Sequence, residues 1–129
     1  MGKVDYLTAW QEMIDFTKKR DQTTEDEFWI CEHLPDFTLG TSLKNSILPI
    51  RGIRCINTDR GGKITYHGPG QLVGYPLMDL RKNNLYPKEL LDLINRTVLS
   101  VMREFGIEGL LVPEAPGIYV SKPGGANQF

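Results

Sequence analysis

The chain is organised around one glycine-rich stretch, which reads Arg60-Gly-Gly-Lys-Ile-Thr-Tyr-His-Gly-Pro-Gly-Gln-Leu-Val-Gly-Tyr-Pro-Leu77. Four of the 13 glycines and one of the two histidines of the chain fall between Arg60 and Gly70. Glycine loses more conformational entropy on folding than any other residue, and it offers no side chain to pack. Glycines gathered among Arg, Lys, Tyr and His therefore indicate a backbone that comes close to a ligand. A β-turn with a hydrogen-bonded histidine is the competing interpretation, and composition leaves both open.

Length and composition indicate a single domain over residues 1–129. The hydrophobic fraction of 40% and the charged fraction of 24% are ordinary for a soluble globular protein. The net charge is -1 and the basic residues are scattered, unlike the basic face of a nucleic-acid binder. No apolar run has the length of a membrane span, and the N-terminus does not read as a signal peptide. We therefore expect a cytoplasmic protein without nucleic-acid or membrane partners, in which Cys31 and Cys55 form no disulfide.

Apolar spacing predicts two amphipathic helices. The first runs from Val4 to about Lys19, and the second begins at Pro87 and is ended by Gly106. The strand predictions rest on short apolar or alternating runs, and Pro76 places one of them at an edge or a bulge. The predicted strands are Phe28–His33, Phe37–Gly40, Gly52–Thr58, Gln71–Met78 and Gly117–Val120, with a loop over Thr41–Pro49.

These elements predict an α+β domain, in which a mixed β-sheet is flanked by helices. Ser121-Lys-Pro-Gly-Gly-Ala-Asn-Gln-Phe129 has the composition of a turn and provides no closing element. We therefore expect the domain to be incomplete at its C-terminus. The strand that ends at Val120 is expected to present an unpaired edge.

The glycine-rich stretch also resembles a known signature. Residues Thr58 to Leu80 are similar to the signature of the octanoyltransferases of lipoate biosynthesis, also called lipoyl(octanoyl) transferases. Glu32-His-Leu-Pro-Asp-Phe-Thr-Leu-Gly40 is similar to that family's Glu-His-Pro-Pro segment ending in Thr-Leu-Gly, and Pro116-Gly-Ile-Tyr-Val120 to its Pro-Gly-Val-Trp-Val strand. The resemblance covers nearly the whole chain and implies the fold of biotin protein ligases and lipoate–protein ligases.

The resemblance implies a reaction and its partners. Enzymes of this family move an octanoyl group from octanoyl-acyl carrier protein to a lysine on the lipoyl domains of 2-oxoacid dehydrogenases or on the glycine-cleavage H protein. The incoming thioester is already activated, so neither ATP nor another cofactor is implied, and no metal site is expected. The residues implied to line the acyl-substrate site are Arg60, Gly61, Gly62, Lys63, Ile64, Thr65, Tyr66 and His67.

The departures from the family pattern concern its catalytic residues. The family's nucleophile is a cysteine in a C-terminal segment, and a lysine in an upstream Lys-Ile-Ala-Ser-Leu-Gly-like strand assists it. Neither segment is found in these residues, and Lys122 is followed by Pro-Gly-Gly rather than by that strand. We therefore assign no catalytic residue. Cys31 and Cys55 lie in predicted strands and are interpreted as core thiols.

The same segments predict how the site is arranged. We expect Gly61, Gly62, Tyr66, His67 and Gly68 to face one cleft, with His33 close to them. Tyr75, Trp10 and Trp29 are interpreted as packing residues.

Three other functions stay open. An ATP-dependent lipoate or biotin ligase shares the fold, although those ligases usually lack the His67-Gly-Pro-Gly-Gln sequence. A non-catalytic homologue could bind an acylated partner or a lipoyl domain. A Cys–His hydrolase would require Cys55 and His67 to lie side by side.

Overall fold

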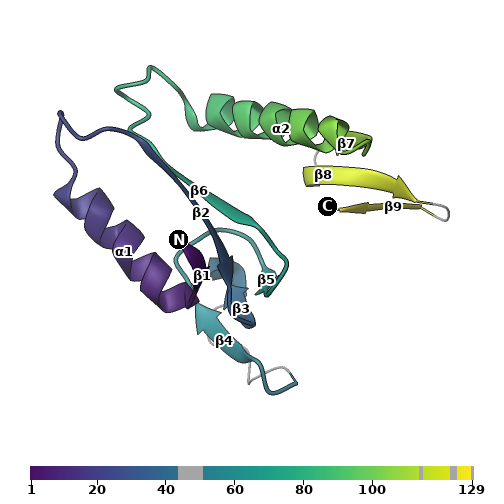
Figure 1. Ribbon diagram of the computed structural model, residues 1–129, viewed down its shortest axis with the longest axis horizontal. Coiled ribbons are helices and arrows are strands. Elements are labelled where there is room, and N and C mark those ends of the chain that lie inside the picture. Colours follow the sequence, from purple (N-terminus) through teal and green to yellow (C-terminus); the bar gives the residue numbers. More distant parts are fainter. Residues whose placement is uncertain (44–50, 114, 123–124, 129) are drawn as a thin grey trace. The chain divides into compact units, whose positions relative to one another are not determined.

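A computed structural model describes residues 1–43, 51–113, 115–122 and 125–128 of the chain. The chain divides into two compact units, Met1–Met78 and Asp79–Phe129. Figure 1 shows the elements of each unit, coloured along the sequence. Helices and mixed sheets occur together, which confirms the predicted α+β class.

The first unit begins with β1 (Gly2–Val4) and helix α1 (Tyr6–Lys19). The helix starts two residues later than predicted because Asp5 caps it, and the Asp5 carboxylate accepts hydrogen bonds from the amides of Leu7 (3.0 Å) and Thr8 (3.3 Å). Phe16 of α1 meets Trp29 edge-on, with 5.8 Å between ring centroids. Helix α1 therefore packs against strand β2 (Glu27–His33), and the two run side by side in Figure 1.

Two three-stranded sheets complete the first unit. In one sheet, β2 lies between β1, which is parallel to it, and the antiparallel β6 (Val73–Leu77). Strand β6 is the outer strand, and Pro76 is therefore at an edge as predicted. In the other sheet, β3 (Asp36–Leu39) lies between β4 (Arg54–Asn57) and β5 (Ile64–His67), and a 3₁₀ turn follows β3 at Thr41–Leu43.

The second unit places helix α2 (Pro87–Glu104) against a sheet. Gly106, at φ +70°, ends the helix, and the Ile107 amide bonds back to the Met102 carbonyl at 2.9 Å. The sheet has the order β7 (Gly109–Val112), β8 (Ala115–Lys122), β9 (Gly125–Gln128), and all its pairs are antiparallel. A Cβ on Gly109 would lie 2.7 Å from a methyl of Leu99 and 2.8 Å from one of Ile118, which shows how closely helix and sheet approach.

The expectation that the strand ending at Val120 has an unpaired edge was wrong. Strand β9 forms within the segment that was expected to be only a turn, and β8 is paired on both sides by β7 and β9. Strand pairing outweighs the weak β-propensity of Gly125-Ala-Asn-Gln128. Three further strands, β1, β5 and β7, were not predicted. Residues 44–49 of the predicted loop lie outside the described residues.

The buried polar residues of the first unit are concentrated around β2 and β3. Buried apolar side chains there include Tyr6, Ala9 and Leu39. Among these lie four buried polar residues, namely His33, Asp36, Thr38 and Thr58. Buried polar groups need hydrogen-bond partners, so the positions of these side chains are fixed by the groups to which they are bonded. The hydrogen-bond partners of Thr38 include Arg60 and His67, which belong to the glycine-rich stretch.

Candidate active site: a glycine loop and two histidines

The predicted site residues form a tight bend followed by strand β5. Adjacent residues of a strand point to opposite faces of the sheet. Thr65 and His67 therefore lie on the face that carries Thr38. His67 is hydrogen-bonded directly to the Thr38 hydroxyl, and the Thr65 hydroxyl accepts from Arg60. Tyr66 lies on the other face, where its ring is 5.3 Å from that of Phe37. The expectation that Tyr66 and His67 both face one cleft is therefore wrong for these two side chains.

The bend closes directly onto the end of β3 because Gly40 has no side chain. The Gly40 amide donates to the Lys63 carbonyl at 2.9 Å, and the Thr41 amide donates to the Arg60 carbonyl at 3.0 Å. A Cβ on Gly40 would lie 2.1 Å from the Gly62 carbonyl oxygen, a distance that no real structure tolerates. Gly62 itself has φ +87°, where residues other than glycine are strained. Glycines are thus required here for backbone contact within the protein. Around Gly61, by contrast, an added Cβ would meet nothing within 4 Å.

The guanidinium of Arg60 holds this bend from inside. The two hydrogens of its Nη2 are shared among four acceptors, namely the Thr38 carbonyl (2.8 Å), the Thr38 hydroxyl (2.9 Å), the Lys63 carbonyl (3.0 Å) and the Thr65 hydroxyl (3.0 Å). Its Nη1 donates to the Gly61 carbonyl at 2.9 Å, and its Nε donates to the Thr38 hydroxyl at 3.3 Å. The planar, five-donor geometry of arginine suits such multiple contacts, and a lysine would not reproduce them. Arg60 therefore connects β3, the bend and β5.

His33 lies beside this sheet, fully engaged by hydrogen bonds. Its Nδ1 is 3.0 Å from the Val4 carbonyl oxygen and its Nε2 is 2.7 Å from the Tyr75 hydroxyl. A carbonyl oxygen only accepts, so Nδ1 carries the proton and Nε2 accepts from Tyr75. Burial raises the pKa of Tyr75, which keeps its hydroxyl protonated as this bond requires. His33 is only 1% exposed.

His67 completes the cluster. Its ring centroid lies 5.6 Å from that of His33 and 5.3 Å from that of Tyr6, which stacks on it. This confirms the expectation that His33 lies close to the glycine-rich stretch. Burial lowers the pKa of His67, with smaller downward contributions from His33 and Arg60, while the Gln71 hydrogen bond opposes the shift. The lowered pKa keeps the His67 imidazole neutral at neutral pH.

The cysteines do not form a nucleophilic pair with a histidine. Cys55 pairs with Phe37 and His67 pairs with Asp36, which are neighbours in β3, so their side chains lie on opposite faces of the sheet. The structure therefore contradicts the Cys–His hydrolase interpretation. The sulfur of Cys31 does lie 3.5 Å from His33 Nε2, but burial raises the pKa of this thiol and disfavours the reactive thiolate. Neither cysteine forms a disulfide, as predicted.

Tyr75, Thr38 and Tyr6 are the contributors to this cluster that the sequence did not indicate. Tyr75 was interpreted as a packing residue, yet its hydroxyl binds His33. Thr38 was only part of a predicted strand, although it bonds both Arg60 and His67. Thr38 lies two residues after Asp36, so both side chains are on one face of β3. Once β3 is known to pair with β5, this position predicts that Thr38 lies on the same face as His67.

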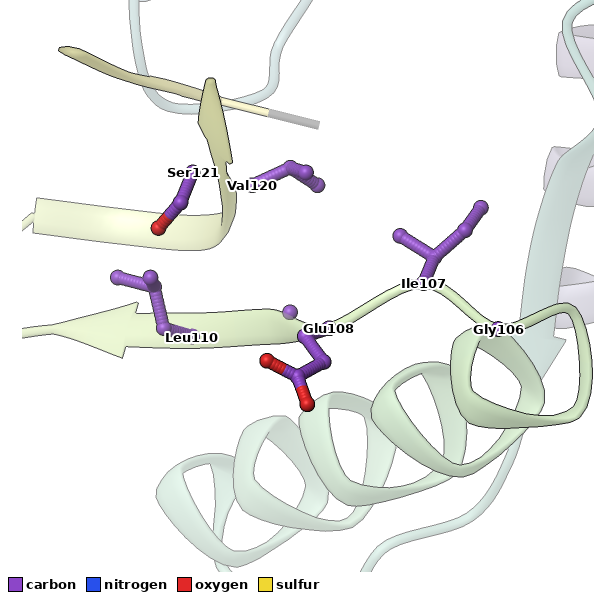
Figure 2. Close-up of a pocket in the computed structure, with 7 residues that line it drawn as sticks. Gly106, Ile107, Glu108, Leu110, Val120 and Ser121 are labelled. Atoms are coloured by element: carbon purple, nitrogen blue, oxygen red, sulfur yellow. The ribbon is translucent and has the colours of Figure 1, made fainter. Parts of the chain in front are cut away.

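Other features of the described residues give no competing site. No group of three His, Cys, Asp or Glu side chains is placed to hold a metal ion, and no helix in this part of the chain is long and apolar enough to span a membrane. A hollow of about 500 Å³ in the second unit lies between the end of α2 and β8, lined by Gly106 to Leu110 with Val120 and Ser121. Glu108 is the one ionisable side chain among these lining residues, which Figure 2 draws as sticks. One carboxylate among aliphatic side chains does not suggest catalysis.

Comparison with known proteins supports the resemblance. Residues 5–123 match the family model described as the lipoyl protein ligase A/B catalytic domain. The chain is 47% identical over 122 residues to an octanoyltransferase of Saccharophagus degradans and 46% identical over 121 residues to one of Vibrio cholerae. These alignments cover 94% and 93% of this chain but 56% of each relative.

A solved structure gives the same fold. A study of an archaeal lipoylation system contains a bi-partite lipoate protein ligase of Thermoplasma acidophilum, which is similar to this chain with a TM-score of 0.60. The match covers 96% of this chain and 55% of that one, and at 14% identity it shows the fold alone. The chain spans about half the length of the curated relatives it matches.

Proposed function

Because the chain belongs to the family of the lipoyl protein ligase A/B catalytic domain, we propose that it supplies the acyl-binding part of an octanoyl-transfer site. The donor would be octanoyl-acyl carrier protein. The acceptor would be a lysine of a lipoyl domain, either in a 2-oxoacid dehydrogenase or in the glycine-cleavage H protein. The setting would be the cytoplasm, and the thioester donor would make ATP unnecessary. The observation that carries the proposal is the identity of 45–47% to octanoyltransferases over nearly the whole chain.

The geometry supports binding at the bend between β4 and β5. Residues Arg60 to His67 would line the acyl-substrate site, with Arg60 acting from within the bend. Gly61 is exposed and has open space around it, so a ligand could approach its backbone closely. Ile64 and Tyr66 are 39% and 45% exposed, which leaves apolar surface for an alkyl chain beside the bend. Backbone amides at such a bend suit a thioester carbonyl.

The test blocks this approach without disturbing the fold. In Gly61→Val the new side chain meets no protein atom at its Cβ, so the free energy of unfolding is expected to stay close to that of the wild type. Binding of octanoyl-acyl carrier protein, measured by calorimetry, is expected to weaken at least tenfold. Gln22→Val, in an exposed turn of the same unit, serves as the matched control and is expected to bind normally.

The comparison ligands identify what is bound. Acyl carrier protein without the octanoyl group is expected to bind weakly to both variants and to the wild type. Equal binding of the octanoylated and unacylated carrier would contradict an acyl site. ATP–pyrophosphate exchange dependent on lipoate or biotin would instead indicate the ligase alternative. Wild-type affinity in Gly61→Val would show that the ligand does not approach the bend.

A further inference from the structure

A directional chain of hydrogen bonds runs from the glycine bend to His67 and beyond. We infer that Arg60 and Thr38 together lock His67 in the neutral tautomer that carries its proton on Nδ1. Arg60 and Thr38 are then positioning residues, which act on the site through the imidazole ring. The lock follows from the contacts alone, whereas its role in acyl binding rests on the proposed function.

The first step is the saturation of the Thr38 hydroxyl oxygen. Arg60 donates to Thr38 Oγ1 from Nη2 at 2.9 Å and from Nε at 3.3 Å. A hydroxyl oxygen has two lone pairs and one proton. Both lone pairs are therefore occupied, and only the proton of Thr38 remains to form a third bond. Thr38 is 0% exposed, so water does not compete for these positions.

The second step fixes the tautomer. His67 Nε2 lies 3.1 Å from Thr38 Oγ1, and because Thr38 has only its proton to offer, Nε2 must accept. The ring proton is then on Nδ1, which lies 3.2 Å from Gln71 Oε1. The Gln71 amide is itself oriented, since its Nε2 donates to the Tyr66 carbonyl at 3.3 Å and leaves Oε1 facing the ring. From Arg60 through Thr38 and His67 to Gln71, every hydrogen bond thus has one donor and one acceptor.

The third step concerns protonation. A second proton on His67 Nε2 would turn it into a donor facing Thr38 Oγ1, which has no lone pair left. The groups that face the ring from neighbouring elements are Tyr6 of α1, His33 of β2, Arg60 of the bend and Asp36 of β3. Arg60 and His33 oppose a positive charge at this point, and Asp36 favours one. Geometry and burial thus both keep His67 neutral.

The lock changes the role expected of two residues. Both ring nitrogens of His67 are engaged by protein groups, so the ring is held in a fixed orientation beside the bend and does not transfer protons between groups. The guanidinium of Arg60 donates its hydrogen bonds to Thr38 and to backbone carbonyls. Removal of the Arg60 side chain would therefore displace the His67 imidazole as well as the bend. A ligand in the proposed site would meet an oriented, uncharged surface.

The experiment reads the tautomer directly by NMR of ring-labelled histidine in the full chain, over a range of pH. In the wild type, His67 is expected to show a protonated Nδ1 and an unprotonated Nε2, with a midpoint below the ordinary value of about 6.5. Thr38→Val removes the hydroxyl, and the ring is expected to populate both tautomers. Thr38→Ser restores the hydroxyl and is expected to restore the wild-type signature.

Arg60→Lys separates geometry from charge. Lysine keeps the positive charge but cannot occupy both lone pairs of Thr38, so the His67 midpoint is expected to move upward and the second tautomer to appear. Arg96→Lys on exposed α2 is the matched control and is expected to leave His67 unchanged.

A wild-type His67 that carries its proton on Nε2, or that titrates at the ordinary value, would overturn the lock even if Thr38→Val failed to fold. An Arg60→Lys variant with the wild-type signature would also overturn it. The outcome is independent of the calorimetric test. Locked histidine without octanoyl-donor binding would refute only the proposed function, and binding with an ordinary histidine would refute only the lock.

Discussion

Asp5 connects the first helix to the second sheet through a single carboxylate. One oxygen caps α1 by accepting from the Leu7 and Thr8 amides, and the other accepts from Arg54. Arg54 also forms a two-pronged ion pair with the buried Asp36, with both N···O distances at 2.8 Å. The hydrogen bond from Arg54 is the main cause that lowers the pKa of Asp5. A residue near the N-terminus thus helps to hold β3 and β4, the strands on which the site is built.

Two substitutions separate these roles. Asp5→Ala removes the cap and the ion pair, and we expect it to lower the free energy of unfolding by about 1–2 kcal/mol. Asp5→Asn keeps a capping oxygen, so its cost is expected to stay below about 1 kcal/mol, which is typical of a partly exposed ion pair. Urea unfolding followed by tryptophan fluorescence measures both, because Trp10 and Trp29 lie in the first unit. Equal losses in the two variants would show that the cap contributes nothing.

The same carboxylate predicts a pH dependence. The folded-state pKa of Asp5 is lower than its unfolded value, so the unfolded chain binds more protons in acid. The stabilisation is therefore present above about pH 3.9 and is lost as the pH falls through the folded-state pKa. The wild type and Asp5→Asn are expected to converge in stability in this acid range. A difference between them that stays constant with falling pH would contradict the ion pair.

At the scale of single residues, the sequence indicated a candidate site but not the hydrogen bonds that connect its residues. Glycine clustering and the resemblance identified Arg60 to His67, and the proximity of His33 followed from them. The partnership of Arg60 with Thr38 depends on the pairing of β3 with β5, which no local pattern encodes. The sequence indicated Arg60 only as a residue that lines the acyl-substrate site, and its hydrogen bonds to the protein's own backbone and hydroxyls could not be predicted from it.

At the scale of elements, the bend before β5 and the end of β3 form one closed unit. Gly40 permits the contact, and the backbone bonds of Gly40 and Thr41 to the bend close it. Helices were predicted well because their apolar spacing spans three or four turns. Strand β5 was missed because four residues between glycine clusters carry too short a pattern, and β9 was missed because its Gly and Pro surroundings indicate turns.

Two glycine substitutions test this closure. Gly40→Ala forces a methyl group to within 2.1 Å of the Gly62 carbonyl oxygen, so the bend must move away from β3. We expect a loss of about 1–3 kcal/mol in the free energy of unfolding, in the range of overpacked cores. Gly61→Ala is the matched control, since its Cβ meets nothing within 4 Å, and its stability is expected to change by less than about 1 kcal/mol. The reverse order of stabilities would contradict the closure.

At the scale of the whole molecule, the two units belong to one family match. The matched residues 5–123 extend from the capped start of α1 in the first unit to the end of β8 in the second. The histidine cluster and the glycine bend lie entirely in the first unit. The curated relatives are longer than this chain, which covers 56% of their length. Binding of an octanoyl donor and transfer of its acyl group are therefore predicted separately for these residues.

The last prediction is that the 129 residues bind an octanoyl donor but do not transfer its acyl group at a useful rate. Acyl transfer through a cysteine needs an accessible thiolate. Cys31 is 2% exposed and its pKa is raised by burial, while Cys55 lies on the sheet face opposite His67. Cys31 therefore does not meet the requirement, and Cys55 lies away from the His67 ring that would have to activate it. A thiolate and its activating group act together, and the loss of one removes most of the rate.

The assay combines octanoyl-acyl carrier protein with an apo lipoyl domain and follows the lipoyl lysine by mass spectrometry. The chain is expected to match a no-enzyme control, while the octanoyltransferase of Saccharophagus degradans serves as the positive control. Cys31→Ser and Cys55→Ser are expected to leave donor binding unchanged, because neither thiol contributes to the bend. Octanoylation of the lysine well above background would overturn this prediction. An octanoyl adduct that disappears in one of the two serine variants would then identify the nucleophile, and the sheet face that carries it would have to be part of the site.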